Sequence, residues 1–157
     1  KSHPFRAHES VLIVNDESPQ ARVTTELLPK IVGGLPLHID QWTGKAHTIP
    51  DSLQQSHTKI LIPLDGDDTA IQFINWLMKG QEPLNKRQSP NTISIVSCLT
   101  HAEVETYATA KKLSFIPSPP SSTHTSLQGL ESRYPGLTHG LLKGASAFRK
   151  AHEAYTL

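Results

Sequence analysis

The 157-residue sequence contains a single cysteine, Cys98, and few aromatic residues, 6% of the total. One cysteine excludes an internal disulfide framework and a cysteine-rich zinc site. Basic and acidic residues are nearly balanced, 15 against 14, so the charge gives no reason to expect nucleic acid or an anionic membrane as a partner. No apolar run is long enough to span a bilayer, and no signal peptide is visible. These absences predict a cytoplasmic domain without membrane contact.

What the sequence does contain is an alternation of short apolar segments with helical patterns. The first of these segments runs straight into a polar, acidic elbow, VLIVNDE, as a buried parallel strand does when it ends at a site. Strand–helix alternation predicts an α/β fold with a parallel sheet covered by helices on both faces. We expect five strands, over residues 11–14, 35–40, 59–64, 92–96 and 114–116.

Local signals mark the ends of several expected helices. Ser18 followed by Pro19 is a helix start, Gly33 and Gly34 form a helix stop, and Thr100 with Glu103 is a capping-box pattern. We expect a linker over residues 1–9, the α/β domain over 10–121 and a C-terminal helical segment over 122–157. The helical segment carries an apolar stripe through Leu141, Ala145, Phe148, His152 and Tyr155. This stripe either packs on the domain or forms a partner or homodimer helix.

Acidic and hydroxyl residues follow the expected strands. Asp16 and Glu17 come after the first, Asp65 after the third, Ser97 after the fourth and Ser118 after the fifth. Ligands of open parallel sheets gather at the carboxyl ends of the strands. Oxygen ligands from two strand ends suit Mg²⁺, and an Asp beside the metal can act as a nucleophile towards phosphoryl donors.

This order of residues resembles the receiver domain of two-component response regulators and hybrid histidine kinases. The resemblance implies a flavodoxin-like three-layer sandwich, with Asp65 as phospho-acceptor, Ser97 as the hydroxyl position and Asp16, Glu17 and Asp65 around Mg²⁺. Two departures stand out: Asn15 replaces the first acid of the pair, and Ser118 stands where receivers carry Lys. We therefore predict a degenerate receiver without catalytic turnover.

A degenerate receiver would be a regulatory module of a hybrid sensor histidine kinase, acting through protein–protein interaction. Its partners would be a histidine kinase or other domains of the parent chain, and the parent could be a membrane-bound sensor. Two alternatives stay open: a receiver that still accepts phosphate on Asp65 with Mg²⁺, and a haloacid-dehalogenase-type phosphatase.

The phosphatase alternative rests on the D-x-D-x-T pattern of residues 65–69, in which Asp65 would be the nucleophile and Asp67 the acid/base. The same acidic run could instead serve only to cap the next helix, and so could Asp16. The sequence has nine His, but no two share a tight metal-ligand spacing on one element, so no zinc site is predicted.

Overall fold

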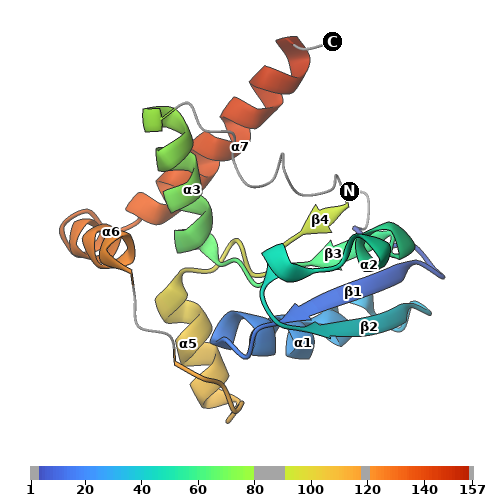
Figure 1. Ribbon diagram of the computed structural model, residues 1–157. Coiled ribbons are helices and arrows are strands. Elements are labelled where there is room, and N and C mark those ends of the chain that lie inside the picture. Colours follow the sequence, from blue (N-terminus) through green and yellow to red (C-terminus); the bar gives the residue numbers. More distant parts are fainter. Residues whose placement is uncertain (1–3, 80–90, 118–120, 156–157) are drawn as a thin grey trace.

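The computed structural model describes residues 4–79, 91–117 and 121–155 (Figure 1). It is an α/β fold built on a parallel sheet of four strands, in the spatial order β2-β1-β3-β4. The strands are β1 (Ser10–Asn15), β2 (His38–Thr43), β3 (Lys59–Leu61) and β4 (Thr92–Ile93). The expected α/β class and the parallel sheet are thus confirmed.

Strand β1 lies in the middle of the sheet and is buried on both faces. Val11 and Ile13 pack in one apolar cluster with residues of α1, whereas Leu12 and Val14 pack in a second cluster on the opposite face. Side chains alternate between the two faces of a strand, so a strand covered on both sides must be apolar at every position. The run of four apolar residues is explained by this position.

Helices follow the strands along the chain. They are α1 (Pro19–Val32), the 3-10 turn η1 (Ala46–Thr48), α2 (Asp51–Ser56), α3 (Gly66–Lys79), α5 (His101–Ala110), α6 (Ser122–Arg133) and α7 (Leu137–Tyr155). The predicted caps are confirmed: Ser18 accepts from the Ala21 amide, Gly33 ends α1 in the left-handed conformation, and Thr100 and Glu103 form a full capping box.

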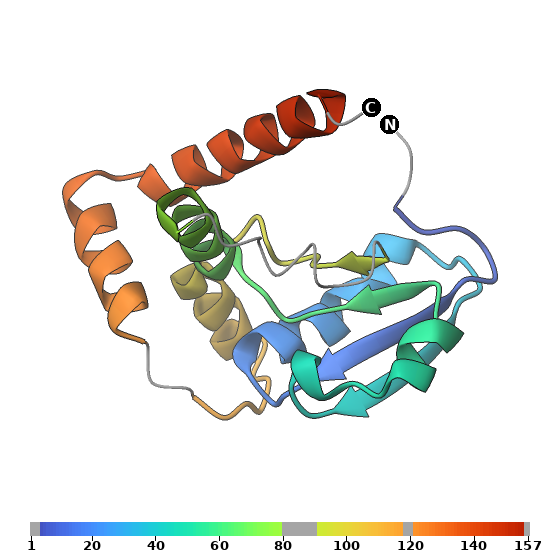
Figure 2. The same ribbon diagram turned by 45° about the horizontal axis from the view of Figure 1, so that its top comes forward.

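Helices α3, α6 and α7 form a group beside the sheet, contacting one another (Figure 1), with α7 running over α3 (Figure 2). Phe148 of α7 lies 4.6 Å from Trp76 and 6.5 Å from Phe73 between ring centroids, and Ala145 is buried. Ala145 and Phe148 of the C-terminal stripe therefore pack on the domain, which was one of the two alternatives for the stripe. The side chains of His152 and Tyr155 lie outside the described residues, and the homodimer alternative stays a prediction. Within the described residues, none of the helices combines the length and apolar character needed to cross a bilayer.

The expected fifth strand is not formed: in the part of the chain that the structure describes, residues 114–116 do not pair as a strand. The amide of Ile116 donates to the Glu17 carbonyl at 2.9 Å, outside any ladder, and Pro117 has no amide to continue one. Strand β3 ends at Leu61, before Pro63, for the same reason. Within the described residues the sheet therefore has four strands rather than five, and the flavodoxin-like detail is not established.

Candidate functional site

Asp65 stands at the start of α3, and its side chain is fully buried. Its Oδ2 accepts hydrogen bonds from Gln20 Nε2 at 2.7 Å and from His101 Nδ1 at 2.9 Å. These two donors lie 2.9 Å apart because they converge on the same oxygen. Three elements, α1, α3 and α5, thus meet at one carboxylate.

The other oxygen of Asp65 caps helix α3. Oδ1 accepts from the Asp68 amide at 2.9 Å, and the Asp65 amide points back at Asp68 Oδ2 at 3.4 Å. Asp67 Oδ2 accepts the amide of His101, at the start of α5, at 3.1 Å. The run from Asp65 to Asp68 therefore does cap helices, as one sequence alternative held, and it also holds the first turns of α3 and α5 together.

Charge is shared between Asp65 and His101. Burial raises the pKa of the Asp65 carboxyl, but hydrogen bonds from His101, the Asp68 amide and Gln20 outweigh it, so the pKa lies below its ordinary value. The hydrogen bond to Asp65 raises the pKa of His101 by more than burial lowers it. His101 Nε2 faces Glu105 Oε1 at 3.5 Å. With a carboxylate at each ring nitrogen, the imidazolium form is favoured, and the pair can hold a proton beside the sheet edge.

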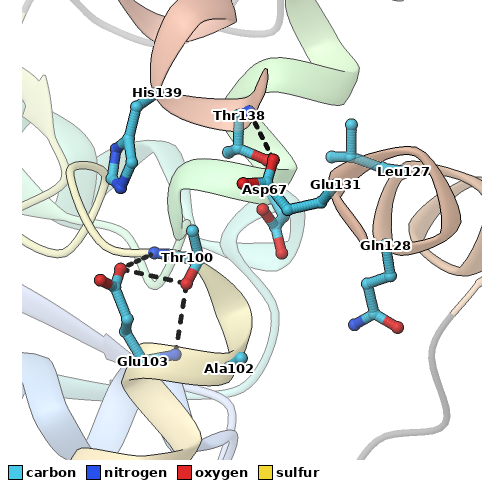
Figure 3. Close-up of a pocket in the computed structure, with 9 residues that line it drawn as sticks. All are labelled: Asp67, Thr100, Ala102, Glu103, Leu127, Gln128, Glu131, Thr138 and His139. Carbon is cyan, nitrogen blue, oxygen red and sulfur yellow. Dashed lines mark hydrogen bonds between the residues drawn. The ribbon is translucent and has the colours of Figure 1, made fainter. Parts of the chain in front are cut away.

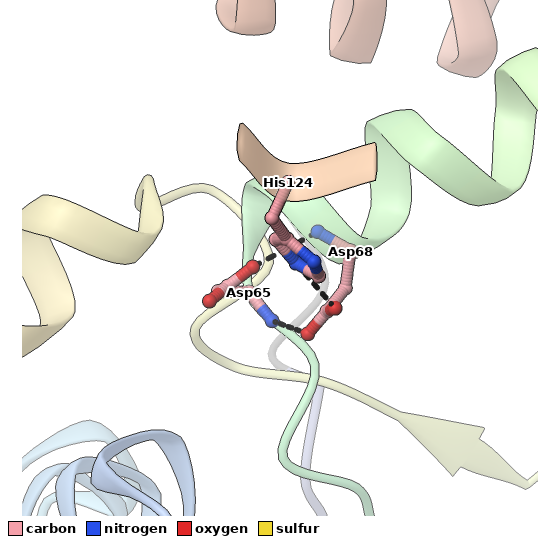
Figure 4. A group of neighbouring side chains, drawn as sticks. All are labelled: Asp65, Asp68 and His124. Atoms are coloured by element: carbon pink, nitrogen blue, oxygen red, sulfur yellow. Dashed lines mark hydrogen bonds and ion pairs between the residues drawn. The ribbon is translucent and has the colours of Figure 1, made fainter. Parts of the chain in front are cut away.

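A second carboxylate–imidazole pair lies against the first. His124 of α6 places Nε2 at 3.0 Å from Asp68 Oδ1, and its ring centroid is 6.0 Å from that of His101. Burial and the nearby charge of Asp65 raise the pKa of Asp68 to about 6. Asp65, Asp68 and His124 each offer one ligand atom, and these atoms lie within 4.8 Å of one another (Figure 4). A group of potential metal ligands is therefore present.

A pocket of about 290 Å³ opens next to this cluster, between α5, α6 and α7. Figure 3 shows its lining side chains, among them three carboxylates, those of Asp67, Glu103 and Glu131. Each accepts a backbone amide at a helix start: Glu131 holds Gly136 and Thr138, Glu103 holds Thr100, and Asp67 holds His101. These carboxylates therefore stabilise the first turns of the helices that surround the pocket.

The residues singled out from the sequence are not all brought together. The exposed Asp16 accepts hydrogen bonds from the amide and hydroxyl of Ser18, and Glu17 faces Arg22 at 3.8 Å. Ser97 Oγ donates to the Ser94 carbonyl at 3.1 Å. Ser118 lies outside the described residues. In the part of the chain that the structure describes, the group of potential metal ligands containing Asp65 is completed by Asp68 and His124, and not by Asp16 or Glu17.

Three residues of the cluster were missed by the sequence reasoning: Gln20, His101 and His124. Gln20 and His101 lie 45 and 36 positions from Asp65, and His124 lies on a helix further on. A search for tight His spacing within one element finds none of them. The only available signal was that His101 directly follows the predicted helix cap Thr100, which places it at a helix start near a strand end.

Comparison with known proteins finds similarity among solved structures. No protein-family model matches the chain, and no curated protein matches its sequence. Among solved structures, the U34-tRNA thiolase NcsA from Methanococcus maripaludis with its [4Fe-4S] cluster is similar, with a TM-score of 0.66 over 94% of this chain and 74% of that chain. The sequence identity is 13%, so the likeness concerns the fold.

The receiver interpretation is corrected by this comparison. The fold resembles that of a tRNA thiolase and no family model supports a receiver, so the predicted two-component signalling function and its phospho-accepting variant are wrong. The phosphatase alternative is not supported either. The physical reason is that acids and hydroxyls after strands are common to many α/β sheets, because the same positions cap the following helices. Asp65 does so here.

The [4Fe-4S] cluster of the thiolase can be tested against the residues of this chain. Such clusters are held by cysteine thiolates, four in the usual case. The whole sequence has one cysteine, Cys98, and it is exposed. The residues present do not fit the cluster, and no chemistry of this chain is derived through it.

The charged side chains of Asp65, Asp68 and His101 predict an unusual pH dependence of the protein's stability in metal-free buffer. A raised pKa means that the folded state binds the proton more tightly than the unfolded chain. The contribution of Asp68 to the free energy of unfolding is fully present below pH 3.8 and is lost as the pH rises to about 6. The contribution of His101 is fully present below pH 6.5 and is lost as the pH rises through the pKa of this residue in the folded protein. The lowered pKa of Asp65 changes the free energy of unfolding with pH only below pH 3.8.

We expect the free energy of unfolding to fall by on the order of 1 kcal/mol between about pH 5 and pH 8, which lowers the melting temperature by about 2–4 °C.

Two variants separate these contributions. Asp68→Asn should flatten the lower part of the melting-temperature profile, and His101→Gln should flatten the upper part. His47→Gln, at an exposed position of η1, is the matched control and should leave the profile unchanged. A wild-type melting temperature that rises across this range would contradict the prediction.

Proposed function

We propose that this chain is a tRNA-modification module of the U34-thiolase type that carries no iron–sulfur cluster of its own. The observation that carries the proposal is the extent of the likeness to the thiolase, 94% of this chain. A match of this extent is not confined to the residues of the four strands.

The missing cysteines define how such a module would work. A thiolase that depends on a [4Fe-4S] cluster needs cysteine ligands that this chain does not contain. The module would therefore bind or position tRNA, while a cluster-bearing chain supplies the sulfur chemistry. This proposal departs from the sequence-based prediction that nucleic acid is not a partner.

Electrostatics sets the expected strength of RNA binding. Affinity for the phosphate backbone comes mainly from Lys and Arg and weakens with added salt. A formal net charge of +1 supplies little of this attraction. The chain alone should therefore bind tRNA weakly, and preference for the tRNA shape rather than raw affinity is the property to measure.

The test uses fluorescence anisotropy at low salt with a U34-containing tRNA transcript. The control ligand is a hairpin RNA of the same length. We expect the chain to bind the tRNA about tenfold more tightly, which corresponds to about 1.4 kcal/mol. Equal binding of the two RNAs, or none to either, would argue against a tRNA-modification role.

A second experiment tests whether the chain can hold an iron–sulfur cluster. The protein is incubated anaerobically with iron, sulfide and a thiol, desalted, and analysed for bound iron and visible absorbance. We expect no stoichiometric [4Fe-4S] signal, because one thiolate cannot hold the cluster. Recovery of a full cluster on the isolated chain would contradict the proposal that another chain supplies it.

A further inference from the structure

The carboxylates and imidazole at the start of α3 point to a function independent of the proposed tRNA role. We propose that Asp65, Asp68 and His124 bind one divalent transition cation of the Zn²⁺ type, with water completing its coordination. The residues come from the β3–α3 junction, the first turn of α3, and α6, so the site exists only in the folded chain.

The geometry is close to that of a bound ion. Asp68 Oδ1 and His124 Nε2 are 3.0 Å apart, and the three ligand atoms of the group lie within 4.8 Å of one another. Two ligands of one tetrahedral Zn²⁺, each at about 2.0–2.1 Å, lie about 3.3 Å from each other. Asp68 and His124 already stand at nearly the separation that one ion requires, and Asp65 is the ligand that has to approach them.

The ligands have outer partners that orient them, as ligands of metal sites generally do. His124 Nδ1 lies 2.8 Å from Ser121 Oγ. With the cation on Nε2, the ring proton sits on Nδ1 and is donated to this hydroxyl. Asp65 is oriented by Gln20 and His101 on Oδ2, and by the Asp68 amide on Oδ1. This outer arrangement is more than an acidic helix cap requires, since a cap needs only the amide contact.

Charge and access also favour a cation. Asp65 and Asp68 bring two carboxylates together, and within the described cluster His101 compensates one of them. A divalent cation would compensate the second. Asp68 and His124 keep 24% and 19% of their side-chain surface, so an ion can enter and water can reach the open position.

An imidazole among the ligands selects the class of metal. Mg²⁺ prefers oxygen ligands and keeps several waters, whereas imidazole suits Zn²⁺ and its neighbours. Three protein ligands with an open fourth position are the pattern of zinc sites that bind water. We therefore expect Zn²⁺ and Co²⁺ to bind more tightly than the Mg²⁺ expected from the sequence.

The experiment titrates tag-free, chelator-stripped protein with Zn²⁺ or Co²⁺ by calorimetry, and follows melting temperature and Co²⁺ visible absorbance. We expect one equivalent to bind, the intense absorbance of low-coordinate Co²⁺, and a rise in melting temperature of about 5–10 °C at a free ion concentration 100-fold above Kd. Mg²⁺ at the same concentration should have little effect. No binding, or Mg²⁺ binding at equal affinity, would overturn the proposal.

Variants locate the ion. His124→Gln and Asp68→Asn remove a ligand each and should weaken binding by about 100-fold or more, whereas His139→Gln and Asp16→Asn should bind as wild type does. Ser121→Gly removes the outer hydroxyl at small cost to the cap and should weaken binding by about 10-fold. This variant keeps the test decisive if a ligand variant fails to fold. Unchanged affinity in all three site variants would place the ion elsewhere and overturn the assignment.

Discussion

Replacing Asp65 with Ala is expected to lower the free energy of unfolding by about 3–5 kcal/mol in metal-free buffer, because it breaks a buried ion pair from one side. The side chain is fully buried and accepts three hydrogen bonds, from Gln20, His101 and the Asp68 amide. The substitution leaves these donors without their acceptor and removes the cap of α3, which alone contributes about 1 kcal/mol. Chemical denaturation followed by circular dichroism measures the loss.

Two further variants separate charge from capping. Asp16→Ala removes an exposed carboxylate whose partners all lie on Ser18, and should cost no more than about 1 kcal/mol. Asp65→Asn keeps a capping oxygen but loses the charge that favours protonated His101, so its cost should fall between the two. A loss below about 0.5 kcal/mol for Asp65→Ala would show that the cluster does not organise the fold as described.

Gly66→Ala should destabilise the protein by about 1–3 kcal/mol, because the added methyl group has no room. A Cβ at Gly66 would lie 2.8 Å from the Leu99 carbonyl oxygen and 3.1 Å from Leu142 Cδ1. The Gly66 amide donates to the same Leu99 oxygen at 2.6 Å, so the two backbones are in direct contact. This approach fixes the loop before α5 against the start of α3, and so sets the distance between His101 and Asp65.

The matched control has the opposite expected sign. Gly129 lies inside α6, and a Cβ there would meet nothing within 4 Å. Gly129→Ala should therefore stabilise the protein by about 0.5–1 kcal/mol, through the higher helix propensity of Ala. Urea denaturation of both variants checks the pair. If Gly66→Ala were as stable as Gly129→Ala, the close backbone contact at Leu99 would be refuted.

Much of the fold could be predicted from the sequence. The helix caps could be predicted because Ser18, Gly33 and Thr100 bond to backbone groups only a few residues away in the sequence. The lengths of the strands were less predictable. Pro63 lies just after the end of β3 and offers no amide to extend the ladder. The apolar pattern of residues 114–116 predicts a strand, but the segment forms no ladder.

The site was predictable only at Asp65. Its place after a buried strand is a sequence property, and it does lie at the centre of the charged cluster. Its partners are not, because Gln20 and His124 belong to patterns that read as helix surface or loop. The receiver resemblance paired Asp65 with Asp16, whereas the structure places it with Asp68, His101 and His124.

By itself, the sequence determined the central strand β1, the α/β alternation, the helix caps and the absence of cysteine ligands, because each follows from local chemistry or composition. Only the tertiary structure decided that two carboxylates and two imidazoles share one place. That decision depends on how α5 and α6 pack beside the start of α3, and packing between residues so far apart in the chain leaves no periodic trace in the sequence.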